Sequence, residues 1–349
     1  MERRGVFKTS QSDSKETFDP SQYPLLLRRY KQRTIEEYGK EVEVCWKWLK
    51  ENGVALHSAR DVDIALVRYM HGLHDRLEGR GVQRAVNTMY GVVSRMPWLR
   101  RNLPMASQCL SGWRRERPSK QHPPLTWPVT CAIAVRMALH GRVREAIGTL
   151  VAFHCQLRAD EVVKVRREDV IDGRDLRYDR RIARTEIVIR DAKTGLNQCV
   201  HVFDAAVLRL LYASLDAARP GTRLWGDEVE KPYGRYYRLF KSVVAELGLS
   251  PAFVPHSLRH GGTTQLHLSG WSMESTKHRG RWRRLDTAER YIQSGRALLG
   301  SALVPEEVAR DGQLFARDIG RALALAQLHF VKGGGQDGRR TRRSRSAHR

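Results

Sequence analysis

Apolar residues recur at three- and four-residue steps through the first third of the chain, and this is the period of an amphipathic helix. The clearest stretch begins at Thr34 and ends before Gly53, a residue type that often follows the last turn of a helix. Its apolar positions are Ile35, Tyr38, Val42, Trp46 and Leu49. Similar patterns predict helices over 61–79, 82–97 and 104–117. Together these segments predict a small helical bundle.

The prolines between residues 117 and 124 cannot continue a helix, because proline lacks an amide hydrogen and fixes φ. We therefore expect a linker between two domains here. Beyond it, helices are predicted over 128–139 and 142–155 and from Ala159 onward. The period changes to two over 183–203, which predicts two short strands with a turn near 193–195. Helical periods return at 204–218, 231–247, 257–269, 273–278, 286–298 and 313–330.

The pattern thus predicts a fold that is mainly α with a small β-hairpin or sheet, in which an N-terminal helical bundle precedes an α+β domain. The expected divisions are a disordered extension at 1–24, a helical domain at 25–117, a linker at 118–125, a second domain at 126–331 and a disordered basic tail at 332–349. The tail holds seven Lys or Arg and one Asp, a composition that is typically disordered when alone.

The net charge of the chain indicates which class of molecule it binds. The chain has 62 Lys and Arg against 38 Asp and Glu, a net charge of +24, and so large an excess points to a polyanion such as nucleic acid. Charge alone leaves a generic RNA-binding protein equally open. The five cysteines are scattered without a CxxC pair, which indicates buried thiols in a reducing compartment and neither a zinc site nor a disulfide framework. No apolar leader or membrane-length run is present, so we expect a soluble, intracellular protein without membrane contact.

Candidate chemistry is concentrated in the second domain. The residues are Arg158, Glu161, Lys193, His256, Arg259, Trp282 and Tyr291. Phosphoryl transfer needs positive donors around the phosphate oxygens, a nucleophile in line and an acid for the leaving oxygen, and this set offers each without a metal or cofactor. Taken singly, each residue has an ordinary interpretation as a surface ion pair, a solvated turn lysine or a packed aromatic. Their joint order is more specific.

That order resembles the tyrosine recombinase (phage integrase-like) family. The matching features are L-R-x-x-E at Leu157–Glu161, a hairpin lysine at Lys193, H-x-L-R at His256–Arg259, and Trp282 nine residues before Tyr291. A tryptophan at the second histidine position is Cre-like. The departures are Arg279 in place of a leucine, an additional Arg281 between Gly280 and Trp282, and His260-Gly261-Gly262 in place of a small hydroxylated run. These departures resemble recombinases of eukaryotic mobile elements.

The resemblance implies a site-specific recombinase or integrase that works through a 3′-phosphotyrosyl intermediate. Tyr291 would be the nucleophile, Arg158 and Arg259 would bind the phosphate, and Trp282 would donate a hydrogen bond. His256 would accept the tyrosine proton, Lys193 would protonate the leaving oxygen, and Glu161 would support Arg158. Residues 25–117 would clamp double-stranded DNA as a SAM-like core-binding domain.

The resemblance also implies a homotetramer on two DNA duplexes, in which the helix at 313–331 packs onto a neighbouring copy. The same helix could instead fold back onto its own domain, and the residues favour neither. The basic tail is interpreted as a nuclear localisation signal in a eukaryotic host or a DNA tether. Two other functions stay open: a type IB-like topoisomerase that acts as a monomer, and a catalytically silent DNA-binding derivative. The DNA target and the direction of recombination are not predictable from the chain.

Overall fold

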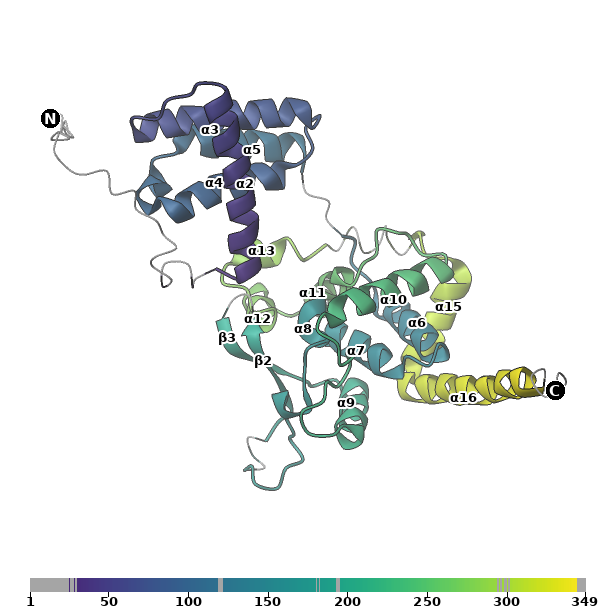
Figure 1. Cartoon of the computed structure of the whole chain (residues 1–349). Coiled ribbons are helices and arrows are strands. Elements are labelled where there is room, and N and C mark those ends of the chain that lie inside the picture. The colour runs from purple at the N-terminus through teal and green to yellow at the C-terminus, as the bar shows by residue number, and fades with distance from the viewer. Residues whose placement is uncertain are drawn as a thin grey trace. The chain divides into compact units, whose positions relative to one another are not determined.

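A computed structural model describes residues 25, 28, 30–118, 122–179, 181, 183–192, 195–293, 295, 297, 300 and 302–343. The chain forms two compact units that divide between residues 120 and 121 (Figure 1). No helix among these residues is long and apolar enough to cross a membrane.

The first unit is a helical bundle, as predicted. It contains α2 (Gln32–Glu51), α3 (Ala59–Arg76), α4 (Val82–Arg95), the 3-10 turn η2 (Pro97–Arg101) and α5 (Pro104–Glu116). Its core includes Val42, Leu66, Tyr69, Met70, Val92, Leu110 and Trp113. The starts of two of these helices are determined by side chains that bond to the free amides of the first turn.

Two helix starts in this unit are capped by side chains. The Ser58 hydroxyl accepts a hydrogen bond from the Asp61 amide and caps α3. The buried Asp63 carboxylate accepts from the amides of Met105 and Ala106, at 3.0 and 2.8 Å, and so ties α3 to the first turn of α5. Pro104 suits that turn because a first-turn amide has no partner within its own helix.

The second unit is built around α6. Its helices are α6 (Trp127–Leu139), α7 (Val143–His154), α8 (Ala159–Val162), α9 (Ala205–Ala217), α10 (Pro232–Glu246), α11 (His256–Leu268), α12 (Met273–Arg279), α13 (Leu285–Glu289), α15 (Glu306–Arg317) and α16 (Ile319–Arg343). Helix α6 is apolar on nearly all sides and is covered by α7, α10, α15 and α16. Because α15 and α16 pack on α6 of the same chain, part of the C-terminal segment folds back onto its own unit.

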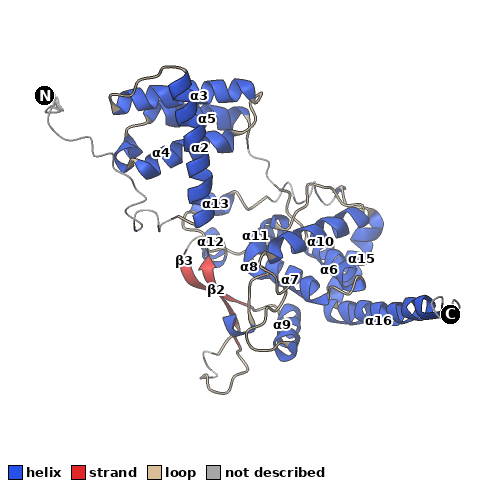
Figure 2. Cartoon of the chain, in the orientation of Figure 1, coloured by secondary structure: helices blue, strands red, loops and turns tan. Residues whose placement is uncertain are grey.

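A small antiparallel sheet completes this unit (Figure 2). Its strands are β1 (Val170–Ile171), β2 (Glu186–Ala192) and β3 (Gly195–His201), in that order, and the 3-10 turn η3 (Arg167–Asp169) precedes β1. Strands β2 and β3 form the expected hairpin, paired from Glu186 opposite His201 to Ala192 opposite Gly195. The predicted fold class, mainly α with a small sheet, is confirmed.

Three predicted elements differ from the structure. The helix expected at 286–298 is interrupted after Glu289, where Thr264 of α11 bonds to the backbone of Tyr291 and Gln293, and residues 295 and 297 are helical again. The helix expected from Ala159 has only one turn, and Arg158 precedes it in extended conformation. Helix α16 continues to Arg343, into the tail expected to be disordered from 332.

Candidate functional site

The first turn of helix α11 carries two of the predicted site residues, His256 and Arg259. The helix packs closely on its neighbours. A Cβ at Gly261 would lie 2.0 Å from the carbonyl oxygen of Leu125, and one at Gly262 would lie 2.0 Å from that of Phe153. A larger residue at position 261 would push α11 away from the segment before α6, and one at position 262 would push it away from α7. The two glycines, a departure from the family pattern, therefore set how deeply α11 lies in the unit.

Arg259 is fully buried beneath the site. One of its terminal nitrogens donates to the carbonyl of Gln156 and the other donates to that of Gly280, at 2.5 Å. Its guanidinium carbon lies 4.5 Å from the centroid of the Trp282 ring and 5.5 Å from that of Tyr291. Burial, with the nearby positive charges of Arg158 and Arg281, lowers the pKa of Arg259 to about 9, which still leaves it charged at neutral pH.

Glu161 joins Arg158 to a second arginine. Its carboxylate accepts from the Arg158 side chain at 2.6 Å, from the Arg158 amide at 2.8 Å and from Arg281 at 2.6 Å. The side chain of Glu161 is 6% exposed and that of Arg158 is 20% exposed, so this is not a surface ion pair. Burial works to raise the pKa of Glu161, but Arg281 and the bonds from Arg158 outweigh it, and the net shift is downward. The Glu161 carboxyl group is therefore ionised at neutral pH.

Tyr291 lies in a turn immediately after α13. Its ring centroid is 4.7 Å from that of Trp282 and 5.6 Å from that of His256. His256 is partly buried, and this burial, followed by the charges of Arg259, His122 and Arg158, lowers its pKa to about 4. The imidazole is consequently neutral at physiological pH and able to accept a proton.

Two departures from the family pattern hold the loop that carries Trp282. Arg279 donates to the carbonyl of His201, at the end of β3, and to that of His154, at the end of α7. Arg281 has a φ of 58°, in the left-handed region that glycine favours, and its side chain turns inward to Glu161. The sequence showed both arginines as departures but did not indicate these contacts.

The structure thus gathers Arg158, Glu161, His256, Arg259, Trp282 and Tyr291 in one cluster. Lys193 lies outside the described residues, although the strands that flank it, β2 and β3, are described. Three arginines (158, 259 and 281) oppose the one carboxylate of Glu161 in this set, which leaves a net positive charge beside the Tyr291 ring. Such a site suits an anion with several oxygens.

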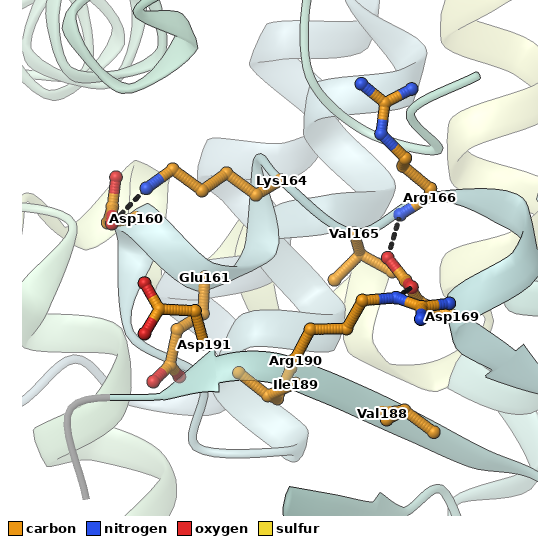
Figure 3. Close-up of a pocket in the computed structure, with 10 residues that line it drawn as sticks. All are labelled: Asp160, Glu161, Lys164, Val165, Arg166, Asp169, Val188, Ile189, Arg190 and Asp191. Atoms are coloured by element: carbon orange, nitrogen blue, oxygen red, sulfur yellow. Dashed lines mark hydrogen bonds and ion pairs between the residues drawn. The ribbon is translucent and has the colours of Figure 1, made fainter. Parts of the chain in front are cut away.

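A pocket of about 200 Å³ is lined by Asp160 and Glu161 of α8, by the segment from Lys164 to Asp169 and by residues of β2 (Figure 3). Its charges are largely paired internally: Lys164 with Asp160 at 2.7 Å, and Arg190 with Asp169. Neither Tyr291 nor Arg259 lines this pocket. In the described part of the chain, no group of three His, Cys, Asp or Glu residues is placed to hold a metal ion.

Comparison with known proteins gives matches among solved structures. No family model matches the chain, and no curated protein matches it. The Tn1549 transposon integrase in complex with transposon right end DNA aligns with a TM-score of 0.54 at 11% identity, over 81% of this chain and 98% of that one. A lambda integrase tetramer bound to a Holliday junction aligns with a TM-score of 0.52 at 14% identity, over 80% and 79%.

A lambda integrase dimer bound to a COC′ core site aligns similarly, with a TM-score of 0.52 at 13% identity, over 79% of this chain and 93% of that one. At such low identity the likeness shows the fold alone. The mainly helical architecture with its three-stranded antiparallel sheet is the same in kind. The chain therefore has the fold of the tyrosine recombinases and integrases.

Proposed function

We propose that this protein is a site-specific DNA recombinase or integrase that cleaves and rejoins DNA through a 3′-phosphotyrosyl intermediate. The observation that carries the proposal is the cluster itself: a tyrosine ring lies beside a buried, charged Arg259, an indole and a neutral imidazole, in a fold shared with integrases.

In the proposed reaction the Tyr291 hydroxyl oxygen attacks the scissile phosphorus, and the bond from phosphorus to the 5′ oxygen breaks. His256, whose lowered pKa keeps its imidazole neutral, accepts the tyrosine proton, and Lys193 gives a proton to the 5′ oxygen. A covalent phosphotyrosine conserves the bond energy for rejoining. No oxidant or nucleotide is consumed.

The other residues stabilise charge on the phosphate. Arg158 and Arg259 would bind the non-bridging oxygens, and the indole N–H of Trp282, which can only donate, would supply a further hydrogen bond. Glu161 would keep Arg158 oriented through one bond from its guanidinium and one from its backbone amide. Trp282 is the position at which the protein would be Cre-like.

Double-stranded DNA would be the substrate and the first unit would serve as a clamp, which the net charge of +24 supports. Four copies would assemble on two duplexes. Exposed apolar side chains on α16, at Leu325, Leu328 and Val331, are available for a neighbouring copy. The protein would act inside the cell and, in a eukaryotic host, in the nucleus, with the tail at 332–349 as its localisation signal. The departures at 279–281 and 260–262 are the grounds for proposing an origin in a mobile element.

The test is a suicide-substrate trap. The full-length protein is incubated with a pool of nicked duplexes, denatured and examined for a covalent protein–DNA band. Tyr291→Phe should abolish the band and leave DNA affinity nearly unchanged, because only the attacking oxygen is removed. Tyr237→Phe, at an exposed tyrosine of α10, is the matched control and should react normally.

The alternatives give different results. A band that persists in Tyr291→Phe would show that another hydroxyl attacks. DNA binding without any band favours a silent derivative, whereas relaxation of a single supercoiled duplex by a monomer, without strand exchange, favours a type IB-like topoisomerase.

A further inference from the structure

His260 has no role in the reaction described above, yet it makes the flattest aromatic contact with Tyr291. The two ring centroids are 4.5 Å apart and the ring planes differ by 19°. The rings of Trp282 and His256 meet Tyr291 at 43° and 68°. His260 is 6% exposed, and its near-parallel stacking places it over one face of the tyrosine ring.

The orientation of the His260 ring is itself fixed. The side-chain amide nitrogen of Gln293 lies 3.1 Å from Nδ1 of His260. An amide nitrogen can only donate, so Nδ1 accepts and the proton stands on Nε2. Burial lowers the pKa of His260 to about 3, against a smaller opposing effect of a hydrogen bond with the Tyr291 backbone, and the ring is neutral at physiological pH.

One helical turn further along α11, Thr264 holds the backbone of the same segment. Its hydroxyl donates to the carbonyl of Tyr291 and accepts from the amide of Gln293, each at 3.2 Å. Helix α13 has five residues and ends two residues before Tyr291, so it positions the tyrosine only in part. The remaining constraint comes from α11.

We propose that His260 is a positioning residue for the nucleophile: its ring stacks on that of Tyr291 and fixes the direction of the tyrosine hydroxyl, while Thr264 fixes the backbone beneath it. This inference rests on the proposed role of Tyr291. Its physical basis is that a misplacement of about 1 Å at a reacting atom can cost on the order of a hundredfold in rate.

The decisive experiment compares two substitutions at position 260 in single-turnover adduct formation on the suicide substrate. His260→Ala removes the stacked ring and should slow the reaction roughly 10- to 100-fold at unchanged DNA affinity. His260→Phe restores a flat ring without the nitrogens and should recover most of that rate. His140→Ala, at an exposed histidine paired with Glu246, should react as the wild type does.

An unchanged rate in His260→Ala overturns the proposal, and so does a His260→Phe variant that melts like the wild type but is as slow as the alanine variant. Failure of the wild type itself to form an adduct would count against the proposed function instead.

A second readout needs no activity. With 3-fluorotyrosine placed at position 291, the ¹⁹F resonance should move in His260→Ala, because the ring current of the stacked imidazole is lost, and should stay in place in His140→Ala. An unmoved resonance in His260→Ala would show that the two rings do not stack in solution and would overturn the inference by itself.

Discussion

Glu161 connects two residues that are far apart in the chain: Arg158, three residues before it, and Arg281, 120 residues after it. A buried carboxylate between two guanidiniums is strongly favoured only while both partners remain, because each charge has lost its water. Arg281 adopts a left-handed φ of 58° to reach this carboxylate, and such backbone costs a non-glycine residue about 1 kcal/mol. Loss of the Glu161 carboxylate would therefore leave Arg281 both strained and without its counter-charge.

We predict that Glu161→Gln lowers the free energy of unfolding by about 3 kcal/mol, since it leaves two arginines without their counter-charge. Adding Arg281→Gly should return part of that loss, because it removes one unpaired charge and the strained backbone together. Denaturant titration of the single and double variants measures this coupling.

The control is Glu246→Gln, which breaks a half-exposed pair with Arg136 and His140 and should cost less than about 1 kcal/mol. Strictly additive effects of Glu161→Gln and Arg281→Gly would contradict the interpretation.

At the scale of elements, α11 is the part around which the site is organised. It supplies His256 and Arg259 from its first turn and holds the Tyr291 segment through Thr264. Its depth in the unit depends on close backbone contact of Gly261 with Leu125, just before α6, and of Gly262 with Phe153 of α7. A change in that packing would therefore move several site residues together.

Gly261→Ala should destabilise the protein by about 1–3 kcal/mol or more, because its Cβ would lie 2.0 Å from a carbonyl oxygen that belongs to backbone. Gly234→Ala in α10 is the matched control: the nearest atom to its Cβ would be the flexible end of Arg238, 3.8 Å away.

Since alanine is the better helix former, Gly234→Ala should be neutral or stabilising by up to about 1 kcal/mol. Thermal melts of both variants decide the matter, and equal melting temperatures would show that α11 can shift without cost.

The sequence predicts some helices and some site residues correctly, but it does not predict the contacts that depend on tertiary packing. Long helices such as α2 and α7 were predictable because their apolar period is dictated by their own core contacts. The end of α13 was not, because it is decided by a hydroxyl from another helix. Motif spacing singled out His256, Arg259 and Tyr291, which the structure brings together. The contact of His260 with Tyr291 depends on tertiary placement and had no signal in the spacing.

At the scale of the whole molecule, the positive net charge and the buried histidines both lower the stability of the fold as pH falls. The net charge is already +24 with histidine neutral. Burial lowers the pKa values of His154 and His256 to about 4 and that of His260 to about 3, whereas histidine in an unfolded chain titrates near 6.5. Between these values the unfolded chain binds more protons, so stability is full above about pH 6.5 and falls as pH drops toward 4.

We predict acid unfolding of the second unit with a midpoint between pH 6.5 and 4, each buried histidine contributing about 3 kcal/mol at most at pH 4. Circular dichroism against pH measures the midpoint. His154→Gln keeps a hydrogen-bond acceptor for the Asp204 amide but cannot be protonated, and should shift the midpoint to lower pH.

Replacement of the exposed His140 by alanine should leave the midpoint where it is. Unfolding that sets in only below pH 4, and equally in His154→Gln, would place the cause in the carboxylates instead.

The two hydrogen bonds of Arg279 have a mechanical consequence. They tie the start of the Gly280–Trp282 loop to the last residue of β3 and to the end of α7. Because one of these bonds ends on β3, we expect a displacement of the strand at His201 to be transmitted to the loop that carries Trp282. We therefore expect contacts made by the described part of β3 to be coupled, through Arg279, to the indole whose centroid lies 4.7 Å from that of the Tyr291 ring.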